Sequence, residues 1–333
     1  MPSTHRRIVL ASRPEAEAGP ENFRLEDVAT PELRDGQVLV RHRFLTVDPY
    51  MRMRMNDVKS YVPPQALDET MGGGAAGEVV ESRSPDFSPG DSVTGPGGWQ
   101  EMSVLKASAL RRVDAKLLPI ETYLGPAGMP GVTAWYGTLK LIAPKPGETV
   151  VVSAAAGAVG GIAGQIARAA GARVVGVAGG PEKCRHVVDD LHFDACVDYK
   201  AADFDTALKD ACPNGIDGIF ENVGGAVLDA CMRRLNPFAR IALCGLISGG
   251  YSAKRLPLAN VTPLLVTRAR IQGFIISDHQ DILAEAQADL AARLADGRLV
   301  WHRSVAEGLE NTPAAFLGML AGKNLGKQLV RLD

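Results

Sequence analysis

The stretch TVVVSAAAGAVG, residues 149–160, decides the fold class of this chain. It begins with a β-branched apolar run, residues 149–152, which is typical of a buried strand. A segment of small residues that favours a helix follows over 159–170, and a second apolar run covers 173–177. A strand, a turn, a helix and a second strand in this order predict a βαβ unit with parallel strands.

The turn inside this unit is built from alanine and glycine. Aligned to the pattern GxGxxG, it has Ala155 at the first glycine position, followed by Gly157 and Gly160. Gly157 would let the backbone approach a pyrophosphate, and Gly160 would let the helix pack closely on the strand. The amino end of the helix would then offer N–H groups to phosphates. Because the glycine pattern is degenerate, a tight turn without a ligand stays open as the alternative.

The end of the second strand predicts which dinucleotide would bind. Folds that bind NAD commonly carry an Asp or Glu about 20 residues after the glycine turn, where it accepts hydrogen bonds from ribose hydroxyls. Here the strand runs into Gly179 and Gly180, and Lys183 follows. Glycines remove bulk and the lysine supplies positive charge, which suits the 2′-phosphate of NADP(H). The alternative is a solvated lysine, although a cation in a first helical turn opposes the helix dipole.

The rest of the chain shows two different patterns of secondary structure. Short strand-like runs at close spacing fill the first part and suggest a barrel-like β domain. Strand-like and helical segments alternate from residue 149 to residue 244, which predicts a parallel sheet covered by helices. We predict a β-rich domain from residues 1–120 plus the returning tail 300–333, and a doubly wound α/β domain over 121–299.

Composition excludes several classes of function. The chain has 333 residues, 46% hydrophobic and 22% charged, with a formal net charge of −2, so a large core is expected and a nucleic-acid surface is not. No apolar run reaches the roughly 18 residues that a membrane helix needs. The amino terminus lacks the long apolar centre of a secretory signal, so we expect a cytoplasmic protein.

The cysteines and histidines argue against a zinc enzyme. The five cysteines are spaced without any CxxC, which favours free thiols in a reducing compartment. Residues 1–120 contain no cysteine and only two histidines, His5 and His42, whereas a catalytic zinc needs several Cys or His ligands. We therefore expect no metal.

Several motifs give the chain a close resemblance to the medium-chain dehydrogenase/reductase superfamily. Within it, the chain resembles the zinc-independent group of leukotriene B4 dehydrogenases, prostaglandin reductases and NADPH-dependent curcumin reductases. The matching stretches are 47–52 (VDPYMR), 131–137 (GVTAWYG), 154–160 (AAAGAVG), 179–183 (GGPEK), 198–200 (DYK), 220–225 (FENVGG), 244–248 (CGLIS), 272–274 (QGF) and 322–327 (GKNLGK). The PYMR (residues 49–52) and CGLIS stretches are specific to this group, whereas the glycine turn is not.

The resemblance implies a fold, a cofactor and a set of contact residues. It implies a GroES-like catalytic domain, a Rossmann domain that binds NADP(H), and a homodimer built by joining Rossmann sheets edge to edge. Lys183 and Tyr199 would hold the 2′-phosphate, and Asn324 would reach the cofactor from the tail. The implied cofactor-binding residues are Gly157, Ala158, Val159, Gly160, Gly180, Lys183, Tyr199, Asn222, Cys244, Gly245, Leu246, Ile247, Ser248, Phe274 and Asn324.

The implied reaction is reduction of an activated C=C bond in an α,β-unsaturated ketone or aldehyde. Hydride adds at the β-carbon, the carbonyl oxygen collects the enolate charge, and a proton adds at the α-carbon. Tyr50 and Tyr251 are the candidate catalytic donors to that oxygen, because a phenol with a pKa near 10 is protonated at neutral pH. The nearby Arg52 and Arg54 are expected to be mainly solvated. The run SGGYS, residues 248–252, departs from the group by one extra glycine, which shifts Tyr251.

Two other functions stay open. A quinone oxidoreductase of the same superfamily is the first, and the PYMR and CGLIS stretches count against it. A protein that binds NADPH without turnover is the second, and only the shifted Tyr251 favours it.

Overall fold

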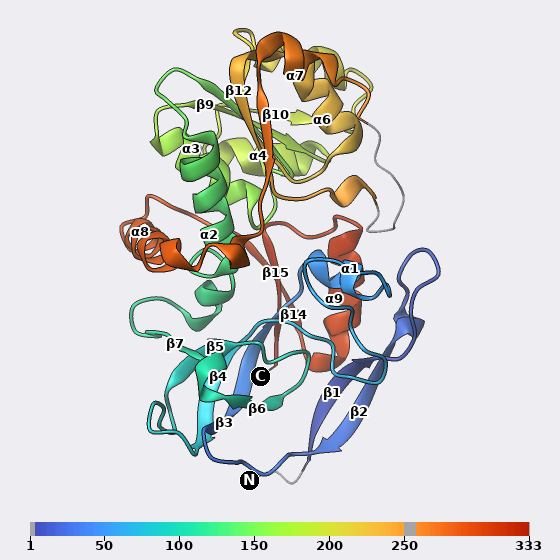
Figure 1. Cartoon of the computed structure of the whole chain (residues 1–333), viewed down its shortest axis with the longest axis vertical. Helices are drawn as coiled ribbons and strands as arrows, with labels where there is room; N and C mark the ends of the chain where they lie inside the picture. Colours follow the sequence, from blue (N-terminus) through green and yellow to red (C-terminus); the bar gives the residue numbers. More distant parts are fainter. Residues whose placement is uncertain (1–3, 250–257, 333) are drawn as a thin grey trace. The chain divides into compact units, whose positions relative to one another are not determined.

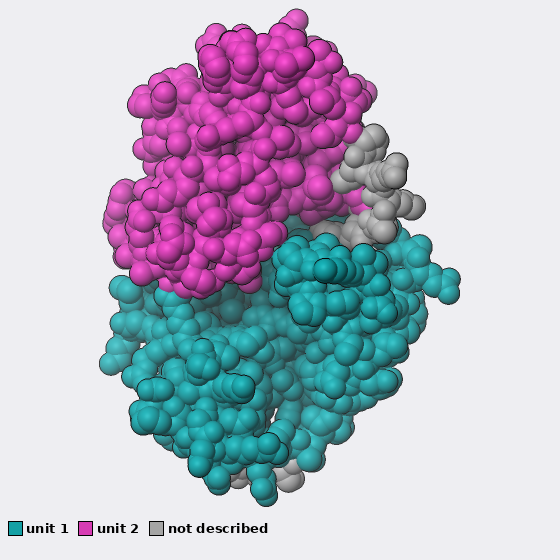
Figure 2. Space-filling view, viewed as in Figure 1, with its two compact units in different colours: residues 1–125, 303–333 teal, residues 126–302 magenta. Residues whose placement is uncertain are grey.

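The computed structural model describes residues 4–249 and 258–332, which form two compact units (Figure 2). Unit 1 comprises Met1–Gly125 and Arg303–Asp333, and unit 2 comprises Pro126–His302. Unit 1 is rich in β-strands and unit 2 contains a parallel sheet with helices, which confirms the predicted α/β class. Among the residues described, no helix has the length and apolar character to cross a membrane.

The sheet of unit 2 contains six parallel strands (Figure 1). Their order is β10-β9-β8-β11-β12-β13, so the direction of winding reverses between β8 and β11. In doubly wound folds this reversal marks the edge at which ligands bind, beyond the carboxyl ends of the strands. The strands are β8 (Thr149–Ser153), β9 (Arg173–Ala178), β10 (Ala195–Asp198), β11 (Ile216–Glu221), β12 (Leu235–Leu243) and β13 (Arg270–Gly273).

Helices connect these strands and bury the sheet. The helical segments of unit 2 are α2 (Met129–Tyr136), the π-helical η4 (Gly137–Ile142), α3 (Gly160–Ala169), α4 (Pro181–Asp189), α5 (Phe204–Ala211), α6 (Gly225–Met232), η5 (Ile247–Gly249), α7 (Thr262–Thr267), η6 (Ile276–Asp278), η7 (Gln280–Ile282) and α8 (Leu283–Ala295). Val151 and Ile219 of the central strands pack with Leu208 of α5 and Leu228 of α6 in one apolar core. Strands covered in this way need continuous apolar runs, as the sequence of β8 shows.

Unit 1 is built on an open, mostly antiparallel sheet. Its order is β14-β15-β3-β4-β5-β7, with β6 also paired to β3, and β1 and β2 form a separate two-stranded sheet. The strands are β1 (Thr4–Leu10), β2 (Phe23–Ala29), β3 (Gln37–Thr46), β4 (Ala75–Ser82), β5 (Ser92–Gly95), β6 (Met102–Lys106), β7 (Arg111–Arg112), β14 (Arg303–Glu307) and β15 (Lys327–Arg331). The helical segments are η1 (Pro20–Asn22), α1 (Tyr50–Arg54), η2 (Ala107–Ala109), η3 (Ile120–Leu124), η8 (Leu309–Asn311) and α9 (Thr312–Leu320). The tail strand β15 lies antiparallel to β3, with Leu329 opposite Thr46.

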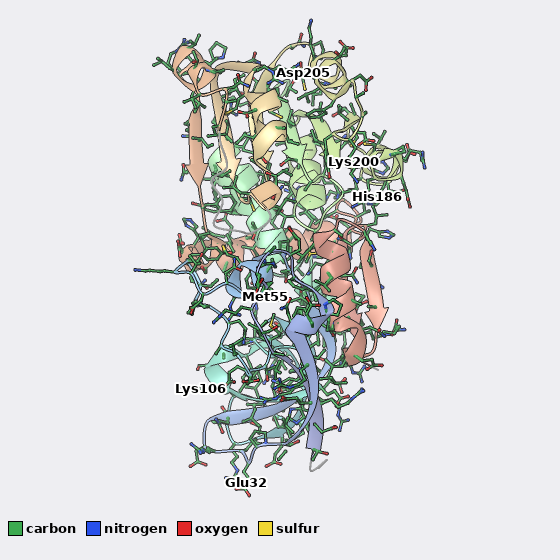
Figure 3. All side chains as sticks on the ribbon, turned by 90° about the vertical axis from the view of Figure 1, so that its right-hand side faces the viewer. Glu32, Met55, Lys106, His186, Lys200 and Asp205 are labelled. Carbon is green, nitrogen blue, oxygen red and sulfur yellow. The ribbon has the colours of Figure 1, made fainter. Side chains whose placement is uncertain are left out.

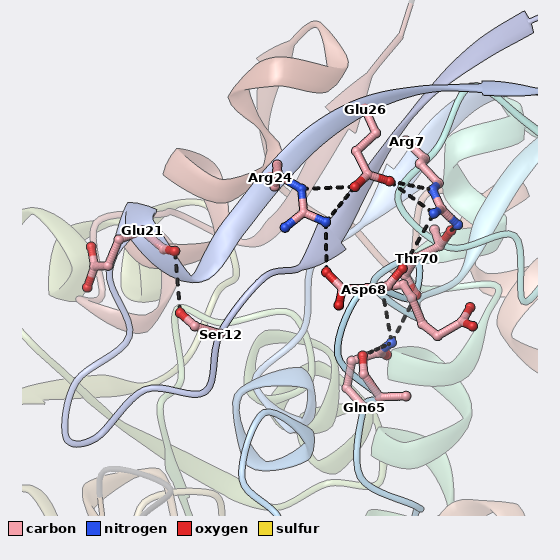
Figure 4. Close-up of polar contacts among 10 residues, drawn as sticks. Arg7, Ser12, Glu21, Arg24, Glu26, Gln65, Asp68 and Thr70 are labelled. Atoms are coloured by element: carbon pink, nitrogen blue, oxygen red, sulfur yellow. Dashed lines mark hydrogen bonds and ion pairs between the residues drawn. The ribbon is translucent and has the colours of Figure 1, made fainter.

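A polar network supports the segment that follows α1 and leads to the glycine run 72–74 (Figure 4). The buried side chain of Gln65 donates to the carbonyl of Thr70 and accepts from the N–H of Gly72, at 3.1 and 3.0 Å. Nearby, Glu26 accepts from Arg7 and Arg24. These ion pairs are partly exposed and contribute about 1 kcal/mol each, so the buried amide of Gln65 is the more important anchor.

Candidate active site

The turn between β8 and α3 has no room for side chains at its key position. A Cβ on Gly160 would lie 2.4 Å from the carbonyl oxygen of Ala154, which is backbone and cannot move aside. Ala154 itself has a φ of +50°, in the left-handed region that non-glycine residues rarely adopt, and the N–H of Gly157 donates to its oxygen at 2.9 Å. Helix α3 begins at Gly160, so residues 157–159 form the turn at its amino end. This small, tightly folded turn fits a pyrophosphate.

Two side chains cross the glycine pair that follows β9. A Cβ on Gly179 would meet Tyr199 Cε1 at 2.9 Å, the Tyr199 hydroxyl at 3.0 Å and Lys200 Cε at 3.1 Å. Gly180 has a φ of +99° and caps the amino end of α4, which carries Lys183 in its first turn. The structure therefore brings Gly180, Lys183 and Tyr199 together around one turn of the chain.

Asp198 connects the backbone of Gly180 to that of Lys200 through hydrogen bonds. Its Oδ1 accepts from the N–H of Gly180 at 2.8 Å and from the N–H of Lys200 at 2.9 Å. These two backbone hydrogen bonds lower the pKa of Asp198, so the carboxylate stays charged. Burial, and then the positive charge of Lys200, lower the pKa of Lys183. Two neighbouring lysines beside a helix amino end suit a phosphate monoester of charge about −2.

Lys200 and Asp198 were missed as site residues by the sequence argument. Lys200 is exposed directly after β10 (Figure 3). Both residues belong to the DYK stretch that contributed to the family resemblance, so a signal was present. What the sequence did not reveal is that this stretch folds back across Gly179.

A buried carboxylic acid organises the end of β11. Glu221 Oε1 accepts from the Ser153 hydroxyl at 3.0 Å and from the N–H groups of Val223 and Gly224 at 2.5 and 2.6 Å. Asn222 donates through its N–H to Ser153 Oγ at 2.7 Å and through Nδ2 to the Ser153 carbonyl at 2.8 Å. The side chain of Glu221 is fully buried, and burial raises its pKa. Glu221 and Ser153 thus hold Asn222 at the switch point between β8 and β11.

The loop after β12 is joined to the loop after β11. The N–H groups of Cys244 and Gly245 donate to the Glu221 carbonyl, and those of Ile247 and Ser248 donate to the carbonyls of Asn222 and Val223. Leu246, Ile247 and Ser248 are exposed. Tyr251, the shifted tyrosine, lies outside the described residues.

Phe274 belongs to an aromatic cluster of unit 2. Its ring lies edge-on to Phe220, with centroids 6.3 Å apart, and tilted against Tyr136 at 5.5 Å. Tyr136 also stacks on His279 at 4.0 Å. A Cβ on Gly137 would come within 2.9 Å of the Phe274 ring, so a glycine at that position lets the cluster close. Phe274 is consequently held in one orientation just beyond β13.

Tyr50 begins the short helix α1 in unit 1. Burial, and then the negative charge of Asp48, raise the pKa of Tyr50 above its usual value, so the phenol keeps its proton. The same helix corrects one expectation, because Arg52 is buried instead of solvated. Its guanidinium donates to Asn56 at 2.8 Å and to the carbonyl of Ala16 at 2.6 Å, which makes it an anchor for the loop.

Asn324 precedes β15, in the same unit as Tyr50. Its Nδ2 donates to the carbonyl of Gly326 at 2.7 Å. Ser304 of β14 supports this loop by accepting from the N–H of Leu325 and donating to its carbonyl. The loop is therefore fixed at Asn324 and at the two residues that follow it.

The two histidines of the first 120 residues bind protein groups. His5 contacts Thr30 and Gln100, and His42 contacts the Gln100 carbonyl and Ser103. In the part of the chain that is described, no three His, Cys, Asp or Glu side chains are grouped as a metal would require.

Two family models and several known proteins are similar to this chain. A family model described as the N-terminal domain of oxidoreductases matches residues 6–113, and one described as zinc-binding dehydrogenase matches residues 158–292. The chain is 47% identical to NADPH-dependent curcumin reductase of Escherichia coli, over 98% of this chain and 97% of that protein. It is 39% identical to the NADP(+)-dependent 2-alkenal reductase of Nicotiana tabacum, over 89% of this chain and 87% of that protein.

A solved structure is also similar. It is CurA of Vibrio vulnificus in complex with NADPH, which superposes with a TM-score of 0.93 at 45% identity and covers 98% of this chain and 99% of that chain. The quinone oxidoreductase of Escherichia coli in complex with NADPH has a TM-score of 0.80 at 19% identity, which shows a shared fold only.

Proposed function

Because the chain belongs to the medium-chain dehydrogenase/reductase family, in the group of curcumin and 2-alkenal reductases, we propose that it reduces the C=C bond of α,β-unsaturated ketones and aldehydes with NADPH. The observation that carries the choice of cofactor is the turn at Gly179, where Tyr199 and Lys200 cross the backbone beside Lys183. An acid that would grip a ribose diol is replaced there by glycine and by positive charge.

We assign the cofactor to unit 2 and the substrate chemistry to unit 1. The turn 157–160 would hold the pyrophosphate, and Lys183, Tyr199 and Lys200 would hold the 2′-phosphate. Asn222, the loop 244–248 and Phe274 would line the path toward the nicotinamide, with Asn324 contributed by the tail. NADPH supplies a hydride for the β-carbon of the substrate.

Tyr50 is proposed to stabilise the charge that develops on the substrate oxygen. Its raised pKa keeps a proton on the phenol over the whole physiological pH range, so it can donate a hydrogen bond to an enolate. A donor that is partly buried is worth more than one in water, because the surrounding dielectric is low. Tyr251 is proposed as a second donor.

The test begins with the purified protein, NADPH or NADH, and a simple enone such as 3-nonen-2-one. We expect turnover with NADPH and a much lower kcat/KM with NADH. Lys183→Ala and Lys200→Ala should each lower kcat/KM for NADPH by about 10-fold or more, without changing it for NADH, because each removes a charge-assisted contact to the phosphate. Lys209→Ala, on the exposed end of α5, is the matched control and should change neither value.

Two outcomes would overturn the proposal. NADPH binding without turnover on any enone or enal would indicate a binding protein. Turnover of quinones alone would indicate a quinone oxidoreductase.

We also propose that two copies of the chain associate through unit 2. Among the residues that the structure describes, β13 is the last strand of the sheet and pairs with β12 alone, so none of the described strands pairs with its outer edge. Four large apolar side chains near that edge are exposed: Phe238, Val261, Leu265 and Val266. Edge pairing between two copies would satisfy the backbone groups and cover these side chains.

A cytoplasmic location completes the proposal. All five cysteines are free thiols, which fits a reducing compartment.

A further inference from the structure

A buried lysine near the end of the chain contacts the turn that carries Tyr50. Lys327, the first residue of β15, is only 2% exposed. Its Nζ donates to the carbonyl of Val47 at 2.9 Å, to Asp48 Oδ1 at 2.8 Å and to the carbonyl of Gln328 at 3.2 Å. An ammonium group has three donors, so these contacts satisfy it completely.

Asp48 is held from a second side. Its Oδ2 accepts from the Thr46 hydroxyl at 2.6 Å. Thr46 is the last residue of β3, and Tyr50 starts α1 two residues after Asp48. The group of Thr46, Asp48 and Lys327 therefore clamps the connection between β3 and α1.

The same lysine follows the loop of Asn324. That loop is fixed by the hydrogen bond from Asn324 to Gly326 and by Ser304, and Lys327 is the next residue after Gly326. The hydrogen bonds of Lys327 thus connect the two segments of unit 1 that are proposed to contact the ligands, the turn before Tyr50 and the loop of Asn324.

A buried ion pair of this kind is a costly way to gain stability. Desolvation of both charges offsets most of their attraction, and an apolar pair of similar volume is often equally stable. The three hydrogen bonds of Lys327 give the backbone at Val47 and Asp48 a defined orientation, which an apolar pair would not do.

We propose that Lys327 is a positioning residue that acts through Asp48 and the Val47 carbonyl to fix Tyr50 relative to the Asn324 loop. This inference rests on the proposed roles of Tyr50 and Asn324. Asp48 also carries the negative charge that helps to keep Tyr50 protonated, so the clamp serves both the placement and the protonation of the phenol.

The first test separates positioning from stability. Lys327→Met alone leaves Asp48 partly buried without its cation and is expected to lower the unfolding temperature. The double variant Lys327→Met with Asp48→Leu replaces the pair by apolar groups and should unfold near the wild-type temperature. We expect its kcat for enone reduction to stay lower by about 10- to 100-fold, because small displacements of a catalytic group have effects of this size. Lys323→Met, in the same loop but on the surface, is the matched control and should keep full activity.

The second test asks whether the effect passes through Tyr50. If it does, the triple variant that combines Tyr50→Phe with the double variant should have the same kcat as Tyr50→Phe alone. If the two effects are independent, the triple variant should have a lower kcat than Tyr50→Phe alone. Wild-type kcat and wild-type NADPH affinity in a stable double variant would overturn the inference, leaving the pair with a purely structural role.

The NADPH dissociation constant, measured by titration without substrate, distinguishes this inference from the proposed function. Tyr50→Phe with wild-type kcat would contradict only the role of Tyr50. In that case a weaker NADPH affinity in the double variant would support positioning of Asn324, and an unchanged affinity would reject it.

Discussion

The carboxyl groups of Asp198 and Glu221 in unit 2 have pKa values shifted in opposite directions by their different environments. Asp198 and Glu221 are each the last residue of a parallel strand, and each accepts hydrogen bonds from backbone N–H groups of a loop. Asp198 is solvated, and its backbone partners lower its pKa, whereas Glu221 is buried and its pKa is raised. Neither is the ribose-binding acid of NAD enzymes, because both side chains are occupied in shaping the loops around a cofactor site.

The burial of His42 leads us to expect that the free energy of unfolding decreases at acidic pH. Its ring is buried in β3, where Nδ1 faces the Gln100 carbonyl and Nε2 faces the Ser103 hydroxyl, both at 2.8 Å. A carbonyl only accepts, so Nδ1 carries the proton of the neutral ring. Burial lowers the pKa of His42 from 6.5 to about 4. The unfolded chain then binds more protons between these values, so stability that is present above pH 6.5 is lost as the pH falls toward 4.

The measurement is urea unfolding at pH 7.5 and pH 5 for wild type and His42→Gln. Glutamine can donate to the Gln100 carbonyl and accept from Ser103 while carrying no titratable charge. We expect wild type to lose more stability than His42→Gln on acidification, by at most about 1.4 kcal/mol per pH unit. His192→Asn, at an exposed position whose left-handed backbone asparagine tolerates, should keep the wild-type slope. Equal slopes in wild type and His42→Gln would rule out this role of His42.

At the scale of elements, the junction of β8 and α3 depends on one glycine. Gly160→Ala would place a methyl group 2.4 Å from the Ala154 carbonyl oxygen, so the turn has to open. We expect the NADPH dissociation constant to rise by about 10-fold or more, since a shifted turn misplaces the N–H groups for the pyrophosphate.

Gly161→Ala provides the comparison for this variant. Its nearest neighbour would be the flexible end of Leu191, Cδ1, at 3.0 Å, so we expect a much smaller change in NADPH affinity. Calorimetric titration of both variants checks the difference. Similar affinities for Gly160→Ala and wild type would mean that the turn does not hold the phosphate.

The sequence predicted those helices and strands that are determined by a local pattern of apolar or small residues. The runs 149–152 and 173–177 became β8 and β9, and the segment of small residues 159–170 became α3, each within one residue of its expected bounds. The first part of β12 contains Pro237 and also Phe238, whose φ of +65° departs from regular strand geometry, so no local pattern marks that part as a strand. Its pairing with β11 shifts register there, which only the neighbouring strand can specify.

The site shows the same division between local and long-range information. Gly160 and Lys183 were found because each lies in a recognisable local pattern. The contact of Lys200 with Gly179, and that of Lys327 with Asp48, join residues far apart in sequence, so no local pattern contains them.

At the scale of the whole molecule, the chain leaves unit 1 after Gly125 and returns to it at Arg303. The return places β15 beside β3, so the last strand of the chain completes the sheet of the first domain. A truncation before β15 would expose the edge of β3 and remove Lys327 at the same time. Folding of unit 1 is therefore tied to the far end of the chain, which raises its contact order.

The proposed pairing of two copies makes the last prediction. Leu265 and Val266 of α7, five and four residues before β13 begins, are 80% and 63% exposed, and such side chains in contact with water favour association. We expect the wild type to sediment as a dimer, and the variant carrying Leu265→Glu and Val266→Glu to sediment as a folded monomer. Leu25→Glu, at an apolar residue of β2 in unit 1 that is 45% exposed, should leave the dimer intact. A monomeric wild type would contradict the proposed pairing, and a dimer that depends on Leu25 instead would place the contact between copies elsewhere than at β13.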